Sequence, residues 1–190
     1  MGMECFQIIA CSDKARIDYG PHGFTVDASE TKNSFMDIVS SIKDLKYVSE
    51  DDSLLSSEKY NKTGIYLRYH DENVYIQLLI SSYDLQGLYF ESISIRFALC
   101  NPLVVVEKVC EILSKVELFM PIQIFVPVFG AVLPVNKEMK NKLGRLIMIS
   151  KEKFVNIFGN FEKPLPCGTK FFNFIKNKKI ICPPKKGKIE

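Results

Sequence analysis

The clearest pattern in the chain is an alternation of apolar and polar side chains between residues 88 and 99. Successive side chains of a strand point to opposite faces, so this stretch predicts a strand with one buried face. Its apolar face would carry Ile93, Ile95, Phe97 and Leu99, and its other face Ser92, Ser94, Arg96 and Ala98. Asn101-Pro102 then stops the strand, and we expect Asn101 to cap a helix that begins at Pro102.

The residues after this stop recur with the period of a helix. The apolar members are Val106, Val109, Cys110, Leu113 and Val116, and the opposite side carries Glu107, Lys108, Glu111 and Lys115. This spacing predicts an amphipathic helix. Packing it on the strand would bury roughly ten apolar side chains, each worth about 1.5–3 kcal/mol before the loss of chain entropy is subtracted.

Further elements precede this strand and helix. We expect strands at Glu4–Cys11 and Phe24–Asp27, a helix at Ser29–Leu45, a polar loop at Glu50–Asn61, and a hairpin of Ile65–His70 with Val74–Tyr83. Asp71-Glu72-Asn73 has the composition of the hairpin turn. The predicted fold class is therefore α+β: an antiparallel β-meander with helices packed on one face and a basic C-terminal extension.

Leu118–Val135 contains eighteen residues without a charge, which is long enough to consider a transmembrane helix. Pro121, Pro127 and Pro134 would break such a helix three times. A buried strand at Ile122–Val126 followed by an apolar loop is the favoured interpretation, and the membrane interpretation is the alternative.

The last third is predicted from shorter patterns. Arg145–Ser150 is expected to be a strand, Lys151–Phe158 a short helix with Ser150 as its cap, and Phe161–Thr169 a loop. The apolar stretch Phe171–Ile175 is expected to pack on the body of the protein, and Pro183–Glu190 to form a solvated tail.

Charge divides the 190 residues into two parts. Residues 1–136 contain 11 Lys and Arg against 18 Asp and Glu, whereas residues 137–190 contain 14 against 4. We expect one α+β core domain at 1–136 and a basic segment at 137–190 packed on it.

Six cysteines occur without a C-x-x-C pair, at positions 5, 11, 100, 110, 167 and 182. The N-terminus has neither the basic start nor the long apolar run of a signal peptide. We therefore expect reduced thiols in a cytoplasmic protein, with a secreted disulfide protein as the alternative. With only two histidines, far apart in sequence, the spacing does not fit a zinc site, and no cofactor motif is present.

Cys100 is the candidate nucleophile, because a helix N-terminus lowers the pKa of a thiol. Its partner base would be His22 or His70, both of which lie in predicted turns. A buried cysteine filling the junction between strand and helix is the favoured alternative.

Charged side chains offer candidate binding surfaces. The acidic clusters form a possible docking surface for a basic partner, and Arg96 is a candidate anion-binding residue; the acidic residues are Glu50, Asp51, Asp52, Asp71 and Glu72. Lysines interleaved with aromatics over Lys151–Lys179 have the composition of a nucleic-acid-binding segment, although no motif of that class is present.

The run Glu91–Leu99, followed by Asn101-Pro102 and a helix after a meander, resembles small bacterial immunity proteins that neutralise toxins delivered between competing cells. The resemblance implies a tight complex with a toxin domain and no catalysis. We therefore expect a non-enzymatic, intracellular protein-binding module; the alternatives are a nucleic-acid-binding protein and a thiol enzyme that uses Cys100.

Overall fold

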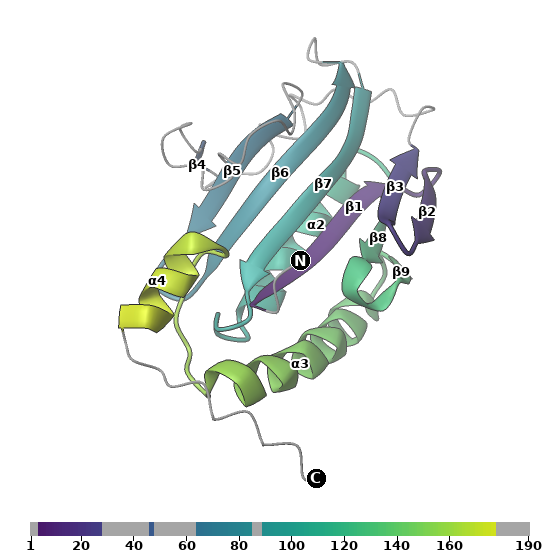
Figure 1. The fold of residues 1–190 in the computed structure, drawn as a ribbon. Helices are drawn as coiled ribbons and strands as arrows, with labels where there is room; N and C mark the ends of the chain where they lie inside the picture. Colours follow the sequence, from purple (N-terminus) through teal and green to yellow (C-terminus); the bar gives the residue numbers. More distant parts are fainter. Residues whose placement is uncertain (1–3, 28–45, 48–63, 85–88, 178–190) are drawn as a thin grey trace, which may run out of the picture.

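The computed structural model describes residues 4–27, 46–47, 64–84 and 89–177, and its main element is a seven-stranded antiparallel sheet (Figure 1). In spatial order the strands are β4 (Lys46–Tyr47), β5 (Gly64–His70), β6 (Tyr75–Asp84), β7 (Tyr89–Ala98), β1 (Cys5–Ser12), β8 (Ile122–Val126) and β9 (Ala131–Pro134). A separate hairpin consists of β2 (Arg16–Gly20) and β3 (Gly23–Asp27). The helices are α2 (Val105–Glu117), the 3₁₀ turn η2 (Pro127–Phe129), α3 (Met139–Phe158) and α4 (Thr169–Asn177). The predicted α+β class and the meander β5–β6–β7 are confirmed.

The alternating strand is in the sheet where the pattern predicted it. Ile93, Ile95 and Phe97 are at most 1% exposed. Ile95 pairs with Ile8 of β1 on one side and with Leu78 of β6 on the other, so the apolar residues of three strands share one face. The residues on this face form the sheet side of the hydrophobic core.

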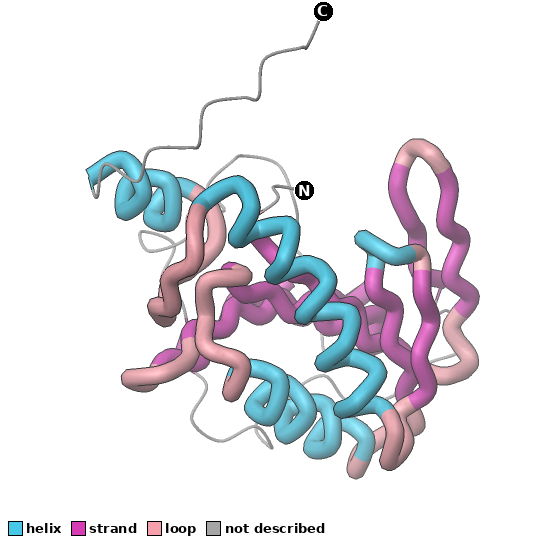
Figure 2. Tube along the Cα trace, turned by 90° about the horizontal axis from the view of Figure 1, so that it is seen from below, coloured by secondary structure: helices cyan, strands magenta, loops and turns pink. Residues whose placement is uncertain are grey.

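Helix α2 covers that face, behind the sheet in Figure 1. Its buried side consists of Val105, Val106, Val109, Ile112, Leu113 and Val116, which contains most of the predicted stripe. Seen from below, α3 crosses the end of the sheet beside α2, while α4 and the β2–β3 hairpin lie on the opposite side of the sheet from α2 (Figure 2). Leu143, Ile147 and Phe154 connect α3 to the same core as α2.

The start of α2 differs from the prediction. The helix begins at Val105, and its N-cap position is Val104, which makes no side-chain capping bond. Asn101 instead is buried and connects three segments. Its Oδ1 accepts a hydrogen bond from the Tyr75 N–H (2.7 Å), while its Nδ2 donates to the carbonyls of Ala98 (2.9 Å) and Leu165 (3.2 Å). The Asn-Pro pair therefore ends the strand, but it does not cap the helix.

The prediction of a strand at Arg145–Ser150 is wrong, because these residues belong to α3, a continuous helix of 20 residues. Its buried positions follow a helical period from Met139 through Leu143 and Ile147 to Phe154, whereas Met148 and Ile149 are exposed. The predicted helix at Lys151–Phe158 is the second half of α3, and Ser150 lies inside the helix rather than at its cap.

The uncharged stretch contains the predicted strand β8, with the predicted bounds. The apolar loop expected after it is a 3₁₀ turn followed by the edge strand β9. Among the described residues no helix is long and apolar enough to cross a membrane.

The expectation of reduced thiols is wrong for two cysteines: Cys5 and Cys167 form a disulfide, with their Cα atoms 5.8 Å apart. Cys11, Cys100 and Cys110 are free thiols. The pairing was not predictable from spacing because 162 residues separate the two cysteines, and only the return of the loop before α4 to the sheet brings them together. The predicted helix at Ser29–Leu45, the loop at Glu50–Asn61 and the tail at Pro183–Glu190 lie outside the described residues.

Candidate binding groove

A groove of about 440 Å³ lies between the β2–β3 hairpin and α3. Its lining comes from the hairpin, from the ends of β1 and β7, from η2 and from α3: Tyr19, Gly20, Pro21, Gly23, Phe24, Cys5, Leu99, Pro127, Val128, Ser150 and Lys153. Most of these side chains are apolar, and Lys153 is the charged side chain among them. A largely apolar groove of this size with a few polar groups is typical of a binding site.

Side chains of β8 hold the hairpin beside the groove. Gln123 donates hydrogen bonds to the carbonyls of Ser12 (3.0 Å) and Ala15 (2.7 Å), which fixes the chain entering the hairpin. The rings of Tyr19 and Phe24 contact the buried ring of Phe125 edge-on, with centroids 5.5 and 5.2 Å away. These contacts orient two aromatic residues toward the space beside α3.

Gly130 has φ +58°, and a Cβ there would lie 3.2 Å from the Tyr19 ring. This glycine therefore lets η2 end in a left-handed residue and lets Tyr19 approach closely. Both features shape the wall of the groove that contains Val128.

Apolar side chains remain exposed around the groove. Tyr19 is 58% exposed and Val128 is 56% exposed, although both belong to ordered elements that pack on the sheet. Large apolar side chains gathered at a hollow indicate an interaction site more often than scattered ones do.

The helix on the other wall is basic. Helix α3 contains five Lys and Arg residues against one Glu. Lys140, Lys142 and Lys151 pair with Glu107, Glu138 and Glu162. Lys153 has no carboxylate partner within the described part of the chain, so it contributes uncompensated positive charge to the groove.

A second hollow of about 540 Å³ flanks α3 on its other side, and its lining includes Leu103, Met148 and Val155. Lys151 closes its inner wall, because this buried amine donates to the Asn101 carbonyl (3.3 Å) and pairs with Glu162 (2.5 Å). Here the positive charge is compensated, which distinguishes this hollow from the groove at Lys153.

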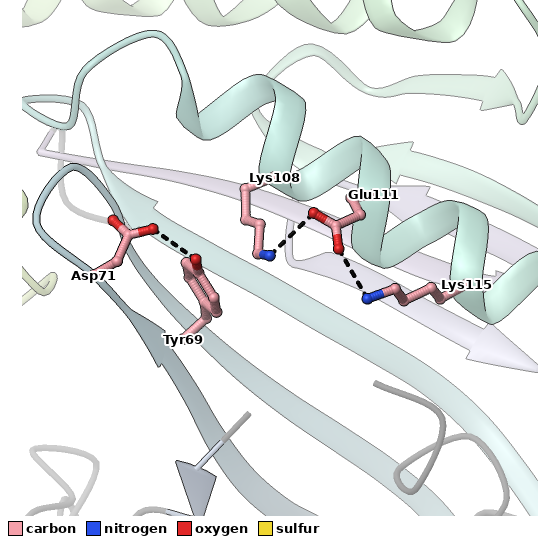
Figure 3. A network of polar contacts seen from close by, with 5 residues as sticks. All are labelled: Tyr69, Asp71, Lys108, Glu111 and Lys115. Atoms are coloured by element: carbon pink, nitrogen blue, oxygen red, sulfur yellow. Dashed lines mark hydrogen bonds and ion pairs between the residues drawn. The ribbon is translucent and has the colours of Figure 1, made fainter. Parts of the chain in front are cut away.

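Asp71 and Glu72 lie away from the groove, at the turn between β5 and β6, and Asp71 is near α2 (Figure 3). Asp71 accepts a hydrogen bond from the Tyr69 hydroxyl (2.6 Å) and from the backbone N–H groups of Asn73 (2.8 Å) and Val74 (2.7 Å). Burial favours a higher pKa for Asp71, but these hydrogen bonds outweigh it and lower the pKa. Asp71 therefore shapes the turn, and Glu72 is exposed beside it.

Lys108 joins this turn to α2. Its amine lies 4.2 Å from the centroid of the Tyr69 ring and 3.0 Å from Glu111, which also pairs with Lys115 at 2.8 Å. The ion pairs with Lys115 and Lys108 lower the pKa of Glu111, and the hydrogen bond to Asp71 raises the pKa of Tyr69. The network is a structural connection between strand and helix.

Arg96 lies on the opposite face of the sheet from this network, so the structure does not bring it together with Asp71 and Glu72. It faces Gln7 and Gln77 on the neighbouring strands. Its Nε is buried without a hydrogen-bond partner, and its Nη2 is 3.9 Å from the sulfur of Cys5. Glu50, Asp51 and Asp52 lie outside the described residues.

The candidate nucleophile Cys100 is fully buried, and burial raises its pKa to about 12, so the thiol stays protonated. Hydrogen bonds and Lys151 oppose this rise but do not outweigh it. His22 is exposed in the turn between β2 and β3, and His70 is exposed at the end of β5. The buried junction residue, which was the alternative interpretation, is the one the geometry supports.

The aromatic residues of the basic segment Lys151–Lys179 lie partly in the core and partly on the surface. Phe154 and Phe171 are at most 1% exposed and face each other at 5.9 Å, so they are not available to stack on bases. Phe172 is 48% exposed. Within the described ranges, no group of three or more His, Cys, Asp or Glu is placed to hold a metal ion.

Comparison of the chain with protein-family models, with curated proteins and with solved structures gave no match. The groove residues were missed in the sequence because Tyr19, Phe24 and Val128 lie in short segments with weak periodicity. The sequence Tyr19-Gly20-Pro21-His22-Gly23 predicts a turn, which is the tip of the β2–β3 hairpin, but no local pattern indicated that this hairpin would lie beside α3.

Proposed function

We propose that this chain is a non-catalytic protein-binding module that takes an acidic segment of a partner protein into the groove between the hairpin and α3. The observation that carries the proposal is the joint presence, in one groove, of exposed Tyr19 and Val128 and of the uncompensated amine of Lys153. Interfaces obtain most of their binding energy from large side chains in pockets, and their selectivity from complementary charge.

The groove favours a specific kind of segment. Its volume and apolar lining suit one aromatic or large aliphatic side chain, and Lys153 favours Asp or Glu beside that anchor. A basic partner would face the repulsion of α3. The charge of the described groove therefore supports an acidic partner, rather than the basic partner considered for the acidic loops.

The resemblance to immunity proteins makes a toxin domain the first partner class to test. In that role the module would act in the cytoplasm and would block its partner by occupying the surface around the inserted segment. The proposal requires no catalytic residue and no cofactor.

A displayed library of random peptides, selected against the purified chain, tests the occupant. We expect enriched peptides with an aromatic or large aliphatic residue next to Asp or Glu, and fluorescence anisotropy should show that Lys153→Glu weakens their binding by about tenfold, because like charges then face each other. Lys115→Glu also reverses a charge, on α2 on the other side of the sheet where Lys115 pairs with Glu111, and should leave the affinity within about twofold.

Enriched peptides without acidic residues would contradict the acidic occupant, and binding that is equally strong in Lys153→Glu would show that the groove is not the site. For a full partner, the wild-type chain and Lys153→Glu are used as matched baits in a lysate of the source cell. A protein captured by the first bait and lost from the second supports the proposal, whereas identical captures contradict it.

A further inference from the structure

The Cys5–Cys167 disulfide has a charged neighbour that the binding function does not use. Cys5 and Arg96 occupy the same face of the sheet on the paired strands β1 and β7, and Nη2 of Arg96 lies 3.9 Å from Sγ of Cys5. Gln77 on β6 accepts a hydrogen bond from the Cys167 N–H (3.1 Å). Three adjacent strands thus place the disulfide and the guanidinium together.

Arg96 is incompletely satisfied next to this disulfide. Its Nε is buried and has no hydrogen-bond partner. A neutral sulfur is a weak acceptor, whereas a thiolate carries a full charge and accepts charge-assisted hydrogen bonds. An orphaned buried donor in a folded protein calls for an explanation, and a redox role is one of the recognised ones.

We propose that Cys5–Cys167 is a reversible thiol–disulfide exchange site whose reduced form is stabilised by Arg96. A low-molecular-weight thiol attacks one sulfur, the S–S bond breaks to give a mixed disulfide and one protein thiolate, and a second thiol releases the other cysteine. Two electrons pass to the protein and the two small thiols leave as their disulfide, so the exchange is balanced. Cys5 lines the groove described above and is 7% exposed, whereas Cys167 is 3% exposed, so Cys5 is the sulfur that a reagent would attack from the groove.

A second charge acts in the opposite direction. Glu4 is 5% exposed, and its Oε1 lies 3.9 Å from Sγ of Cys5. A carboxylate there disfavours a thiolate, whereas the guanidinium favours it. The two neighbours therefore predict shifts of opposite sign in the equilibrium between the two thiols and the disulfide.

Opening of the disulfide would remove the covalent connection between β1 and the loop that leads to α4. The remaining contacts of this loop and α4 include the backbone bond from the Lys163 N–H to the Cys100 carbonyl (2.7 Å), the bonds of Asn101 and Gln77, and the burial of Phe171. We therefore expect the reduced chain to stay folded with α4 attached, which allows the exchange to be reversible.

The experiment equilibrates the full chain in glutathione buffers of graded GSH/GSSG ratio, quenches with acid, and quantifies the linked Cys5–Cys167 peptides by mass spectrometry. Arg96→Gln should raise the equilibrium constant for disulfide formation by about tenfold, which corresponds to about 30 mV for a two-electron couple. Glu4→Gln should lower it. Arg16→Gln removes an exposed strand arginine that pairs with Asp18, and should change it by less than about twofold.

Shifts of the same sign in Arg96→Gln and Glu4→Gln, or an Arg96→Gln constant within twofold of wild type, would overturn the proposal. A chain that forms no Cys5–Cys167 linkage in any of the buffers would also overturn it. If Arg96→Gln does not fold by near-ultraviolet circular dichroism, Arg96→Lys and Glu4→Gln decide: the lysine variant should lie within about threefold of wild type, and a glutamine variant at position 4 that favours the disulfide refutes the electrostatic account.

Discussion

Phe171 of α4 gives the sharpest test of how the C-terminal part of the chain is connected to the sheet. Its side chain is 0% exposed, although it belongs to a nine-residue helix at the end of the described chain. The rings of Phe158 and Phe154 lie 5.4 and 5.9 Å from its own ring. Phe172, the next residue, is 48% exposed and provides a control with the same side chain.

The expected magnitude follows from this difference in burial. Truncation of a buried phenylalanine to alanine removes its transfer free energy and leaves a cavity, which together cost about 3–5 kcal/mol. For Phe172→Ala, half of the side chain is already in water, so we expect a loss below about 1 kcal/mol. At about 2–4 °C per kcal/mol for a chain of this size, Phe171→Ala should lower Tm by roughly 6–20 °C.

Urea unfolding followed by far-ultraviolet circular dichroism measures both variants, with the disulfide kept in the same state in each. We expect a lower midpoint for Phe171→Ala at an unchanged m-value, which means that the same surface unfolds at lower stability. Equal midpoints for the two variants would refute the conclusion that α4 is part of the single core. A loss of helical signal before the main transition would refute it as well, because α4 would then detach on its own.

Three further outcomes follow from the structure. Gly130→Ala should destabilise the fold by about 1–2 kcal/mol, because alanine is strained at φ +58° and its Cβ would press on Tyr19. Gly144→Ala lies inside α3, where a Cβ would meet nothing within 4 Å, and should stabilise the fold by about 0.5–1 kcal/mol. Thermal unfolding of both variants checks these opposite signs. Glu111→Gln should cost less than about 1 kcal/mol of stability at neutral pH, because it removes two exposed ion pairs. The folded pKa of Glu111 lies below its unfolded value, so this contribution is present above the unfolded pKa and is lost as the pH falls through the folded pKa. A difference in urea midpoint between wild type and Glu111→Gln that is equal at pH 7 and pH 3 would contradict the ion pairs as its source. Iodoacetamide at pH 8 should alkylate Cys100 in the folded chain at least about 100-fold more slowly than a free cysteine peptide, since burial raises its pKa to about 12; comparable rates by mass spectrometry would show that the thiol is accessible and ionised.

The meander could be predicted because its strands largely alternate between apolar and polar residues, so each has one mainly apolar face. Ile93 and Phe97 are buried as the period-2 pattern predicted, and the hairpin turn at Asp71 follows from turn chemistry. Such patterns are local, so a single stretch of sequence contains the whole signal.

Helix α3 was misread because two periods overlap in one segment. The run Leu146–Ile149 is continuously apolar, which favours a strand, but only Ile147 is deeply buried, and the helical spacing from Leu143 to Phe154 extends across it. The role of Asn101 was mispredicted for a different reason. Its short amide side chain can cap a helix or connect loops, and its actual hydrogen-bond partners, Tyr75 and Leu165, are distant in sequence.

The candidate site was the least predictable part. The hairpin residue Tyr19 and the helix residue Lys153 are separated by most of the chain, and their side chains carry no catalytic or ligand-binding motif. Their proximity results from the packing of the hairpin on Phe125 and of α3 on the core, which no local pattern encodes. The same holds for the pairing of Cys5 with Cys167.

The position of β1 has a consequence for synthesis on the ribosome. It is the earliest strand of the sheet in the chain, yet it pairs on one side with β7 and on the other with β8. At translation rates of about 5–20 residues per second, roughly 80 more residues must be made before the first of these neighbours begins to emerge, which takes several seconds. During that interval the strands that pair with β1 have not been made, so we expect the apolar side chains of Phe6 and Ile8 to rely on transient contacts or on a chaperone until β7 and β8 are available.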